Sequence, residues 1–251
     1  MYNFFVEESA RVGAAFGITG ADYNHIVHVL RMRTGETFFV SAGGRQYLCR
    51  LAGISEDTVT AEILEEKEES TELPISVTLF QGLPKSDKLE LIIQKAVELG
   101  ADAVIPVEMH RSIVKIDEKK KNAKKERWQA IAEAAAKQSK RNRVPEISAP
   151  VSYKAAMELA KELDVFLVPY ENEEGFSGTK AALARLTKGC KIGILIGPEG
   201  GFEEREIALA KEAGGLSVSL GRRILRTETA AITALGMCML YAEEHFPEGS
   251  R

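Results

Sequence analysis

The sequence predicts an α/β protein in two parts, a small β-barrel followed by a larger domain built on a mostly parallel sheet. Short strand-like segments separated by glycines fill the first 65 or so residues. The stretch 65–72 is too polar to be buried, which is typical of a linker. Beyond it apolar runs alternate with helical patterns, and a strand–helix–strand order requires parallel strands. We therefore expect domains at 1–70 and 74–251.

The first part alternates strand signals with turns, as small barrels do. Its strands are expected at 3–6, 37–40, 46–50 and 58–63. A helical pattern over 22–31 interrupts them, with Asp22 as its N-cap. A small β-barrel with one helix fits this order.

The second part begins with a strand at 75–81, an amphipathic helix at 87–99 that Gly100 ends, and a strand at 103–107. This alternation of strands and helices then continues along the rest of the sequence. Further helices are expected at 124–140, 179–186 and 227–244, and further strands at 165–168, 191–196 and 216–220.

Two glycine-bearing loops, 197–202 and 220–230, each follow a strand-like apolar run. Both should leave the carboxyl ends of neighbouring parallel strands, where ligands bind in open α/β sheets. Glycine admits positive φ and close backbone approach, which favours a nucleotide or phosphate site, although a plain tight turn remains possible for 197–202. Neither G-x-G-x-x-G nor G-x-x-x-x-G-K-[ST] occurs, so dinucleotide and Walker-type phosphate binding lose support.

The second loop places Arg222, Arg223 and Arg226 beside Glu228, directly before an alanine-rich helix. Arginines hold phosphate or uracil oxygens well, and a glutamate favours a nearby cation. The two loops together indicate a cationic nucleoside cofactor beside a nucleic acid. A salt bridge at the start of the helix is the alternative explanation of these charges.

The charge distribution also favours a polyanionic partner. The net charge is −4, but residues 1–70 carry 6 basic and 11 acidic groups, whereas residues 81–145 carry 15 basic and 9 acidic groups. Lysines and arginines that contact phosphates supply most sequence-independent affinity for nucleic acids. A solvated lysine-rich helix is the competing explanation.

The sequence gives little support for a metal site, a disulfide or a membrane span. Cys49, Cys190 and Cys238 lack metal-site spacing, and the pair His25 and His28 has no further ligand nearby. No apolar stretch approaches the roughly 20 residues of a membrane span, and the start of the chain lacks a signal-peptide layout. We expect a cytoplasmic protein without a metal.

Motifs along nearly the whole chain are similar to those of a known family. The strongest are Ile-Gly-Pro-Glu-Gly-Gly at 196–201 and Leu-Gly at 220–221 with Ile-Leu-Arg-Thr-Glu-Thr-Ala at 224–230. They resemble the trefoil-knotted (SPOUT) methyltransferases, and within them the ribosomal RNA small subunit methyltransferase E family, which methylates N3 of a uridine in 16S ribosomal RNA. Further matching segments are 25–36, 84–100, 111–115, 127–138 and 141–145.

The resemblance implies an amino-terminal PUA-like barrel that helps to bind RNA, and an α/β-knot domain with a carboxyl-terminal trefoil knot. It implies S-adenosyl-L-methionine as the cofactor, a homodimer, and 16S ribosomal RNA or the assembled small subunit as the partner. Relatives commonly carry an arginine where this chain has Asn3, which weakens the case for an RNA contact there. The small-residue face Ala230, Ala231 and Ala234 of the last helix could permit close packing between two copies.

Individual residues are expected to have particular roles. Because Arg226 and Glu228 are adjacent in the sequence, we expect Arg226 to stabilise negative charge on the uracil oxygens, and Glu228 to orient that arginine or to accept the N3 proton. Leu220, Ile224 and Leu225 would pack on the adenine or belong to the core. The cofactor-binding residues are expected to be Leu195, Ile196, Gly197, Glu199, Gly200, Gly201, Leu220, Gly221, Ile224, Leu225, Thr227 and Thr229. The RNA-binding residues are expected to be Arg31, Lys85, Lys88, Arg111, Lys115, Arg141, Arg143, Arg222 and Arg223.

Three other functions remain open. The chain could methylate a different RNA nucleotide, bind RNA without catalysis, or act as a nucleotide-dependent phosphotransferase. The absence of a phosphate-loop lysine disfavours the last of these. Failure to bind S-adenosylmethionine would favour the second.

Overall fold

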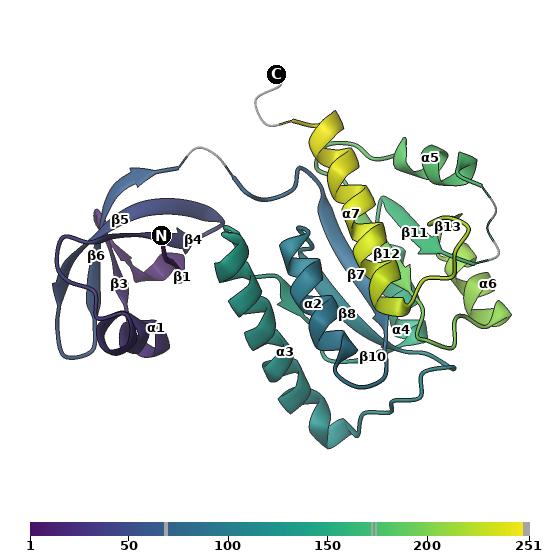
Figure 1. Ribbon diagram of the computed structural model, residues 1–251, viewed down its shortest axis with the longest axis horizontal. Coiled ribbons are helices and arrows are strands. Elements are labelled where there is room, and N and C mark those ends of the chain that lie inside the picture. Colours follow the sequence, from purple (N-terminus) through teal and green to yellow (C-terminus); the bar gives the residue numbers. More distant parts are fainter. Residues whose placement is uncertain (68–69, 172, 174, 248–251) are drawn as a thin grey trace. The chain divides into compact units, whose positions relative to one another are not determined.

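The computed structural model describes residues 1–67, 70–171, 173 and 175–247 (Figure 1). The chain forms two compact units. The first unit comprises residues 1–72 and 136–144, and the second comprises residues 73–135 and 145–251. The sequence-based division at 70–74 places 136–144 in the second domain, whereas the structure groups this segment with the first unit.

The first unit is a curled sheet of six strands in the order β1-β4-β5-β6-β3-β2. β1 pairs with β4 in parallel, and the other neighbours are antiparallel. Aromatic side chains fill the concave core, where the rings of Phe4 and Phe38 meet edge to face with centroids 5.4 Å apart. The strands are β1 (Asn3–Phe5), β2 (Arg11–Val12), β3 (Ala15–Ile18), β4 (Thr37–Ala42), β5 (Arg45–Ile54) and β6 (Val59–Glu66).

The four strands expected in this unit are confirmed as β1, β4, β5 and β6. The sequence did not predict β2, which has 2 residues, or β3, whose alanine and glycine lack the β-branched alternation typical of strands. A helix is present where the sequence predicted one over 22–31, but it is not α-helical throughout. It begins as α1 (Gly20–Asn24) and continues as a π-helical turn at His25–Val29, where the Leu30 N–H donates to the His25 carbonyl over 2.8 Å.

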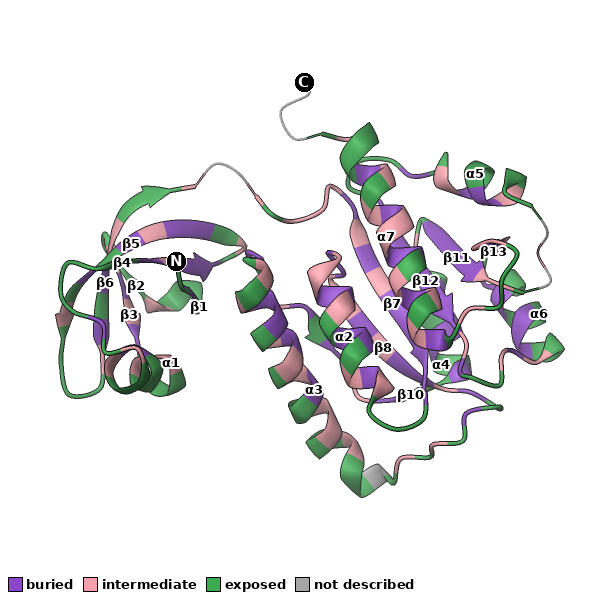
Figure 2. Cartoon of the chain, in the orientation of Figure 1, coloured by how far each residue is buried: buried purple, intermediate pink, exposed green. Residues whose placement is uncertain are grey.

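The second unit has a parallel sheet in the order β10-β8-β7-β12-β11-β13, with β9 paired to β8. The central strand β12 (Lys191–Ile196) lies between β7 (Ser76–Gly82) and β11 (Val165–Pro169). Figure 2 shows these strands almost entirely buried, as their continuous apolar sequences require. The remaining strands are β8 (Ala103–Glu108), β9 (Glu146–Ile147), β10 (Val151–Ser152) and β13 (Gly215–Val218).

The helices of the second unit confirm the expected alternation. The predicted helices at 87–99, 179–186 and 227–244 are present with shifts of a few residues, and the helix expected at 124–140 is longer than predicted. The helices are α2 (Lys88–Glu98), α3 (Glu118–Ser139), α4 (Tyr153–Ala160), α5 (Ser177–Leu183), α6 (Glu204–Glu212) and α7 (Thr227–His245), and the last turn of α3 groups with the first unit.

The chain crosses the carboxyl edge of the sheet on its way to the last helix. β13 is the edge strand beside β11, whereas α7 packs against α2 and β12. Residues 219–226 therefore pass the connection from β11 to α5, and Thr179 holds them there through two bonds with the Ser219 backbone of 3.0 and 2.9 Å. This is the expected place of the trefoil knot. The crossed connection contains residues 172 and 174, which lie outside the described residues, so the knot stays a prediction.

Two properties of the fold limit the chemistry available. Within the described residues, no helix combines the length and apolar character that crossing a lipid bilayer requires. Cys49, Cys190 and Cys238 are free and buried, and burial raises the pKa of Cys49 and of Cys238 to about 12. These two thiols therefore stay protonated and are poor nucleophiles.

Candidate functional site

A cavity of about 440 Å³ lies at the carboxyl ends of β11, β12 and β13. Its volume falls within the range of small-molecule sites. The two loops that the sequence singled out form much of its wall, and the first residues of α2 and α7 complete it. The lining residues are Lys88, 169–171, 196–202, Leu220, Gly221, 223–227 and Ala230.

The loop after β12 is a tight turn with close backbone contacts. Gly201 has a φ of +69°, and its N–H donates to the Pro198 carbonyl over 2.9 Å. A Cβ on Gly200 would lie 2.9 Å from the Cβ of Arg111, and the Arg111 side chain donates to the Gly200 carbonyl over 3.0 Å. Glycine is therefore required here for both conformation and space.

The loop after β13 presents an apolar surface to the cavity. Gly221 has a φ of +114°, and its N–H donates to the Ser219 hydroxyl over 3.2 Å. Ile224 is 89% exposed although it lines the cavity, and Leu225 is half-buried. An exposed isoleucine in a cavity suits a flat apolar group such as a purine ring.

A buried chain of hydrogen bonds joins the two loops. The Thr227 hydroxyl donates to the Gly197 carbonyl over 2.7 Å, and the amide of Gln81 donates to the Thr227 hydroxyl over 2.9 Å. The same amide donates to the Gly82 carbonyl over 2.9 Å. Gln81 is fully buried at the carboxyl end of β7, so the start of α7 is fixed against 197–202.

Lys88 forms a second connection, between side chains. Its ammonium lies 3.2 Å from Glu199 Oε1 and 3.2 Å from Glu228 Oε2. The Lys85 N–H also donates to both Glu199 oxygens, over 3.1 and 3.3 Å. The carboxylate of Glu199 is thus occupied by the β7–α2 connection, and only its backbone is left for the cofactor contact expected of it. The ammonium of Lys88 is likewise paired with these two carboxylates, and the RNA contact expected of Lys88 stays a prediction.

The protonation states of Glu199 and Lys88 are constant near neutral pH. Burial alone would raise the pKa of Glu199, but hydrogen bonds from its own backbone, Lys88 and the Lys85 N–H lower the pKa overall. The pKa of Lys88 is raised by the hydrogen bond to Glu199 and then by that to Glu228. The contribution of Glu199 to stability is present above about pH 4.3 and is lost as the pH falls through its lower folded-state pKa. That of Lys88 is present below about pH 10.4 and is lost as the pH rises through its higher folded-state pKa.

The arginines of the second loop are exposed. Arg226 is the N-cap of α7 and lines the cavity, and it forms no ion pair with any described residue. Arg223 also lines the cavity, whereas Arg222 lies outside it. The carboxylate of Glu228 pairs with Lys88, so the expected pairing of Glu228 with Arg226 is absent from the described structure.

The twelve residues expected to bind the cofactor divide into two groups. Ten of the twelve line the cavity: Ile196, Gly197, Glu199, Gly200, Gly201, Leu220, Gly221, Ile224, Leu225 and Thr227. Leu195 is fully buried in β12, and Thr229 is exposed on α7, and neither lines the cavity. Their expected contact with a cofactor is therefore unsupported.

Within the second unit, the basic residues expected to bind RNA do not gather at one place. Lys85 and Arg111 are exposed beside the 197–202 loop, while Lys115 lines a separate groove next to α4 and α6. Arg31 and Arg143 belong to the first unit and are exposed.

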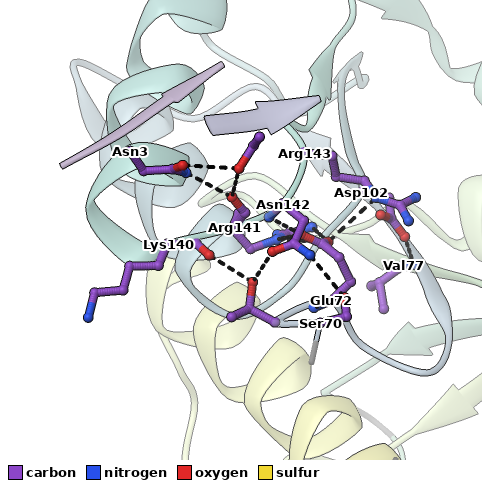
Figure 3. Close-up of polar contacts among 11 residues, drawn as sticks. Asn3, Ser70, Glu72, Val77, Asp102, Lys140, Arg141, Asn142 and Arg143 are labelled. Atoms are coloured by element: carbon purple, nitrogen blue, oxygen red, sulfur yellow. Dashed lines mark hydrogen bonds and ion pairs between the residues drawn. The ribbon is translucent and has the colours of Figure 1, made fainter. Parts of the chain in front are cut away.

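Arg141 is buried, so a direct contact with RNA phosphates is excluded for its side chain, contrary to expectation. The guanidinium is 3% exposed and pairs with the carboxylate of Glu72, with Nε 3.0 and 2.9 Å from its two oxygens (Figure 3). The Arg141 carbonyl accepts a bond of 3.3 Å from Asn3, whose side chain also accepts a bond from Ser41. Asn3 and Arg141 are structural residues of the first unit.

Replacing Arg141 with methionine should therefore destabilise the protein. The Glu72 carboxylate would remain buried without its cation, which costs about 3–5 kcal/mol of unfolding free energy. Thermal or denaturant unfolding measures this loss. Arg50→Met is the matched control, because its pair with Glu62 is exposed to water and should change the unfolding free energy far less. An equally stable Arg141→Met protein would contradict the structural role.

Family models match both parts of the chain. An RNA methyltransferase domain matches residues 71–239, and an RNA methyltransferase PUA domain matches residues 18–64. The ribosomal RNA small subunit methyltransferase E of Bacillus subtilis is 42% identical over 242 residues, which cover 94% of each chain. The protein of the same name from Synechocystis is 34% identical over 93% of this chain and 76% of its own length. The chain belongs to the ribosomal RNA small subunit methyltransferase E family.

Solved structures agree with membership of this family. A ribosomal RNA small subunit methyltransferase E from Neisseria gonorrhoeae, bound to S-adenosyl methionine, superimposes with a TM-score of 0.80 at 31% identity and covers 96% of this chain and 97% of its own. A putative methyltransferase from Legionella pneumophila in complex with the same cofactor has a TM-score of 0.81 at 29% identity, with 95% and 97% covered. The PUA half-barrel and the parallel-sheet methyltransferase domain are thus those of the methyltransferase E family.

Sequence reasoning missed several residues of this methyltransferase E site. Tyr170 and Glu171 line the cavity just beyond β11, where the rule that ligands bind at the carboxyl ends of parallel strands could have found them. Gln81 is a polar residue at the end of an apolar strand, which is a usable signal. Phe202 lines the cavity and is buried. The centroid of its ring lies 6.3 Å from that of the Tyr170 ring.

Proposed function

We propose that this protein transfers a methyl group from S-adenosyl-L-methionine to N3 of a uridine in 16S ribosomal RNA. The observation that carries the proposal is the cavity formed by 196–202 and 220–227 in a chain of this family. Both loops carry motifs that resemble those of this family, and they enclose one space with an apolar surface and two arginines.

The residues present fit this cofactor. Ile224 and Leu225 offer an apolar surface for an adenine ring, and the backbone of the glycine turn at 197–201 admits a close approach. When bound, S-adenosylmethionine supplies an electrophilic methyl group on a sulfonium. The cofactor contacts are proposed for the ten cavity-lining residues named above, with the side chain of Glu199 excluded.

The chain's own contribution to the reaction is proposed to be alignment and charge stabilisation. N3 of uracil is a weak acid, so the anion must be stabilised or its proton accepted. Arg226 is exposed at the cavity and forms no ion pair with the residues that the structure describes, and it is the residue proposed to stabilise charge on the uracil oxygens. The neighbouring Glu228 is proposed either to accept the N3 proton or to orient side chains of the site.

RNA binding is proposed to depend on exposed arginines and lysines, so the KM for RNA should rise steeply with salt. Arg222→Ala combined with Lys115→Ala should flatten the plot of log KM against log salt, because each lost phosphate contact removes about 0.7–0.9 from the slope. Lys188→Ala is the matched control, since Lys188 is exposed before the amino end of β12, on the opposite edge of the sheet from the cavity. An unchanged slope in the double variant would exclude these two contacts.

Assembly as a homodimer and the domain division 1–70 and 74–251 are also proposed. The small-residue face does not support the dimer, because Ala231 and Ala234 are buried where α7 packs on α2 and β12 of the same chain. Apolar surface remains at Leu91 of α2, which is 43% exposed, and at Leu240 of α7, which is 64% exposed. Sedimentation of the purified protein tests this, and a monomer that methylates would contradict it.

The function is tested with labelled S-adenosylmethionine and small ribosomal subunits that lack uridine-N3 methylation. After the reaction the RNA is digested and the labelled nucleoside is identified by mass spectrometry. Labelled 3-methyluridine at one site is the expected result. A different methylated nucleoside would retain the cofactor but change the target, and ATP binding in preference to S-adenosylmethionine would contradict the proposal.

A further inference from the structure

One side chain connects both walls of the cavity. Lys88 opens α2, Glu199 belongs to the loop after β12, and Glu228 lies in the first turn of α7. The ammonium of Lys88 is 3.2 Å from a carboxylate oxygen of each glutamate, and the lysine itself lines the cavity. Removal of this one cation would leave two carboxylates next to the place proposed for an anionic substrate.

The backbone of the two walls does not depend on Lys88. The buried chain from Gln81 through Thr227 to Gly197 already fixes the start of α7 to the loop after β12. The Glu199 carboxylate also still accepts a hydrogen bond from the Lys85 N–H when Lys88 is removed. Glu228 differs from Glu199, because its side chain has no partner other than Lys88 among the described residues. Removal of Lys88 is therefore expected to change mainly the position of the Glu228 carboxylate.

The position of Glu228 matters because of Arg226. Arg226 is two residues away, at the N-cap of α7, and is exposed in the cavity without an ion pair to any described residue. Once Lys88 is removed, Arg226 is the cation closest to Glu228 in the sequence. A pair between Arg226 and Glu228 would remove the charge that the substrate needs.

Resting on the proposed function, we propose that Lys88 is a positioning residue that holds the Glu228 carboxylate and thereby keeps Arg226 free for the uracil oxygens. Lys88 does not touch the reacting atoms in this account. Its raised pKa keeps it cationic through the neutral range, so the arrangement persists at the pH of catalysis.

The test is a double-mutant cycle on the full-length protein. Single-turnover methyl transfer to small subunits lacking uridine-N3 methylation is measured for wild type, Lys88→Met, Glu228→Gln and the double variant. Lys88→Met should lower the rate constant about 10-fold or more in the wild-type background, and change it by no more than about twofold in the Glu228→Gln background. Lys88→Arg keeps the charge and should recover most of the loss. Equal losses in both backgrounds, or no recovery by arginine, would overturn the proposal.

A second measurement separates this proposal from the proposed function and from misfolding. Titration of carboxyl resonances by NMR should show the pKa of Glu199 rising in Lys88→Met, while calorimetry should show nearly unchanged binding of S-adenosylmethionine. An unchanged pKa of Glu199 would mean that the ion pairs of Lys88 do not form in solution. If wild type itself fails to methylate uridine, the proposed function fails, whereas the NMR titration still decides whether the Lys88 cluster exists.

Discussion

Replacing Arg226 with alanine is expected to lower the rate constant for methyl transfer about 100- to 1,000-fold, the range found when a preorganised donor to a developing anion is removed. The physical reason is that Arg226 is exposed in the cavity and forms no ion pair with any described residue. Its charge is therefore available to the substrate. The Kd for S-adenosylmethionine should change little, because the proposed cofactor contacts come from the backbone and apolar residues of the two loops.

The measurement is single-turnover transfer, with cofactor binding followed separately by calorimetry. Arg222→Ala is the matched control, since it removes the same charge from the same loop but from outside the cavity. It should raise the KM for RNA and leave the single-turnover rate at saturating RNA nearly unchanged. Wild-type rates in Arg226→Ala would remove Arg226 from the mechanism, and equal rate losses in both variants would point to general electrostatics.

The sequence predicted the place of the site because its two signals are local. Each glycine-bearing loop directly follows an apolar strand, and carboxyl ends of parallel strands meet at one edge of a sheet. The structure brings 197–202 and 220–230 together at that edge, as expected. The strand β3 was missed because its Ala15 and Gly17 pair with β6 through backbone bonds that leave no pattern in the sequence, and β2 was missed because it consists of Arg11–Val12 alone, paired with β3.

The partners of the charged side chains could not be predicted, since they are distant in sequence. Lys88 pairs with Glu199 and Glu228, and Arg141 with Glu72, across separations that no helical or strand spacing specifies. Arg141 lies in a basic stretch and Glu72 in an acidic one, so both appear solvated until the fold buries them together. Charge patterns alone indicated exposed groups where the structure has an internal ion pair.

Gly82→Ala is expected to raise the Kd for S-adenosylmethionine about 10-fold or more, equivalent to about 1.4 kcal/mol of binding free energy. Gly82 ends β7, and its φ lies outside the left-handed region, so alanine is acceptable to the backbone itself. The obstacle is space. A Cβ there would lie 2.7 Å from the Pro198 nitrogen, 2.8 Å from Pro198 Cδ and 2.7 Å from Met109 Sδ. The methionine can move, but Pro198 is part of the loop that forms the cavity wall.

Gly236→Ala is the matched control, because nothing lies within 4 Å of its Cβ position. In the middle of α7 the added methyl should stabilise the protein by up to about 1 kcal/mol and leave the cofactor Kd unchanged. Calorimetric titration of both variants, with thermal unfolding to verify the fold, distinguishes a displaced loop from general damage. Wild-type affinity in a folded Gly82→Ala protein would mean that 197–201 does not hold the cofactor. The fixed backbone spacing between β7 and this loop would then be a packing contact alone, and the cofactor proposal would rest on the second loop.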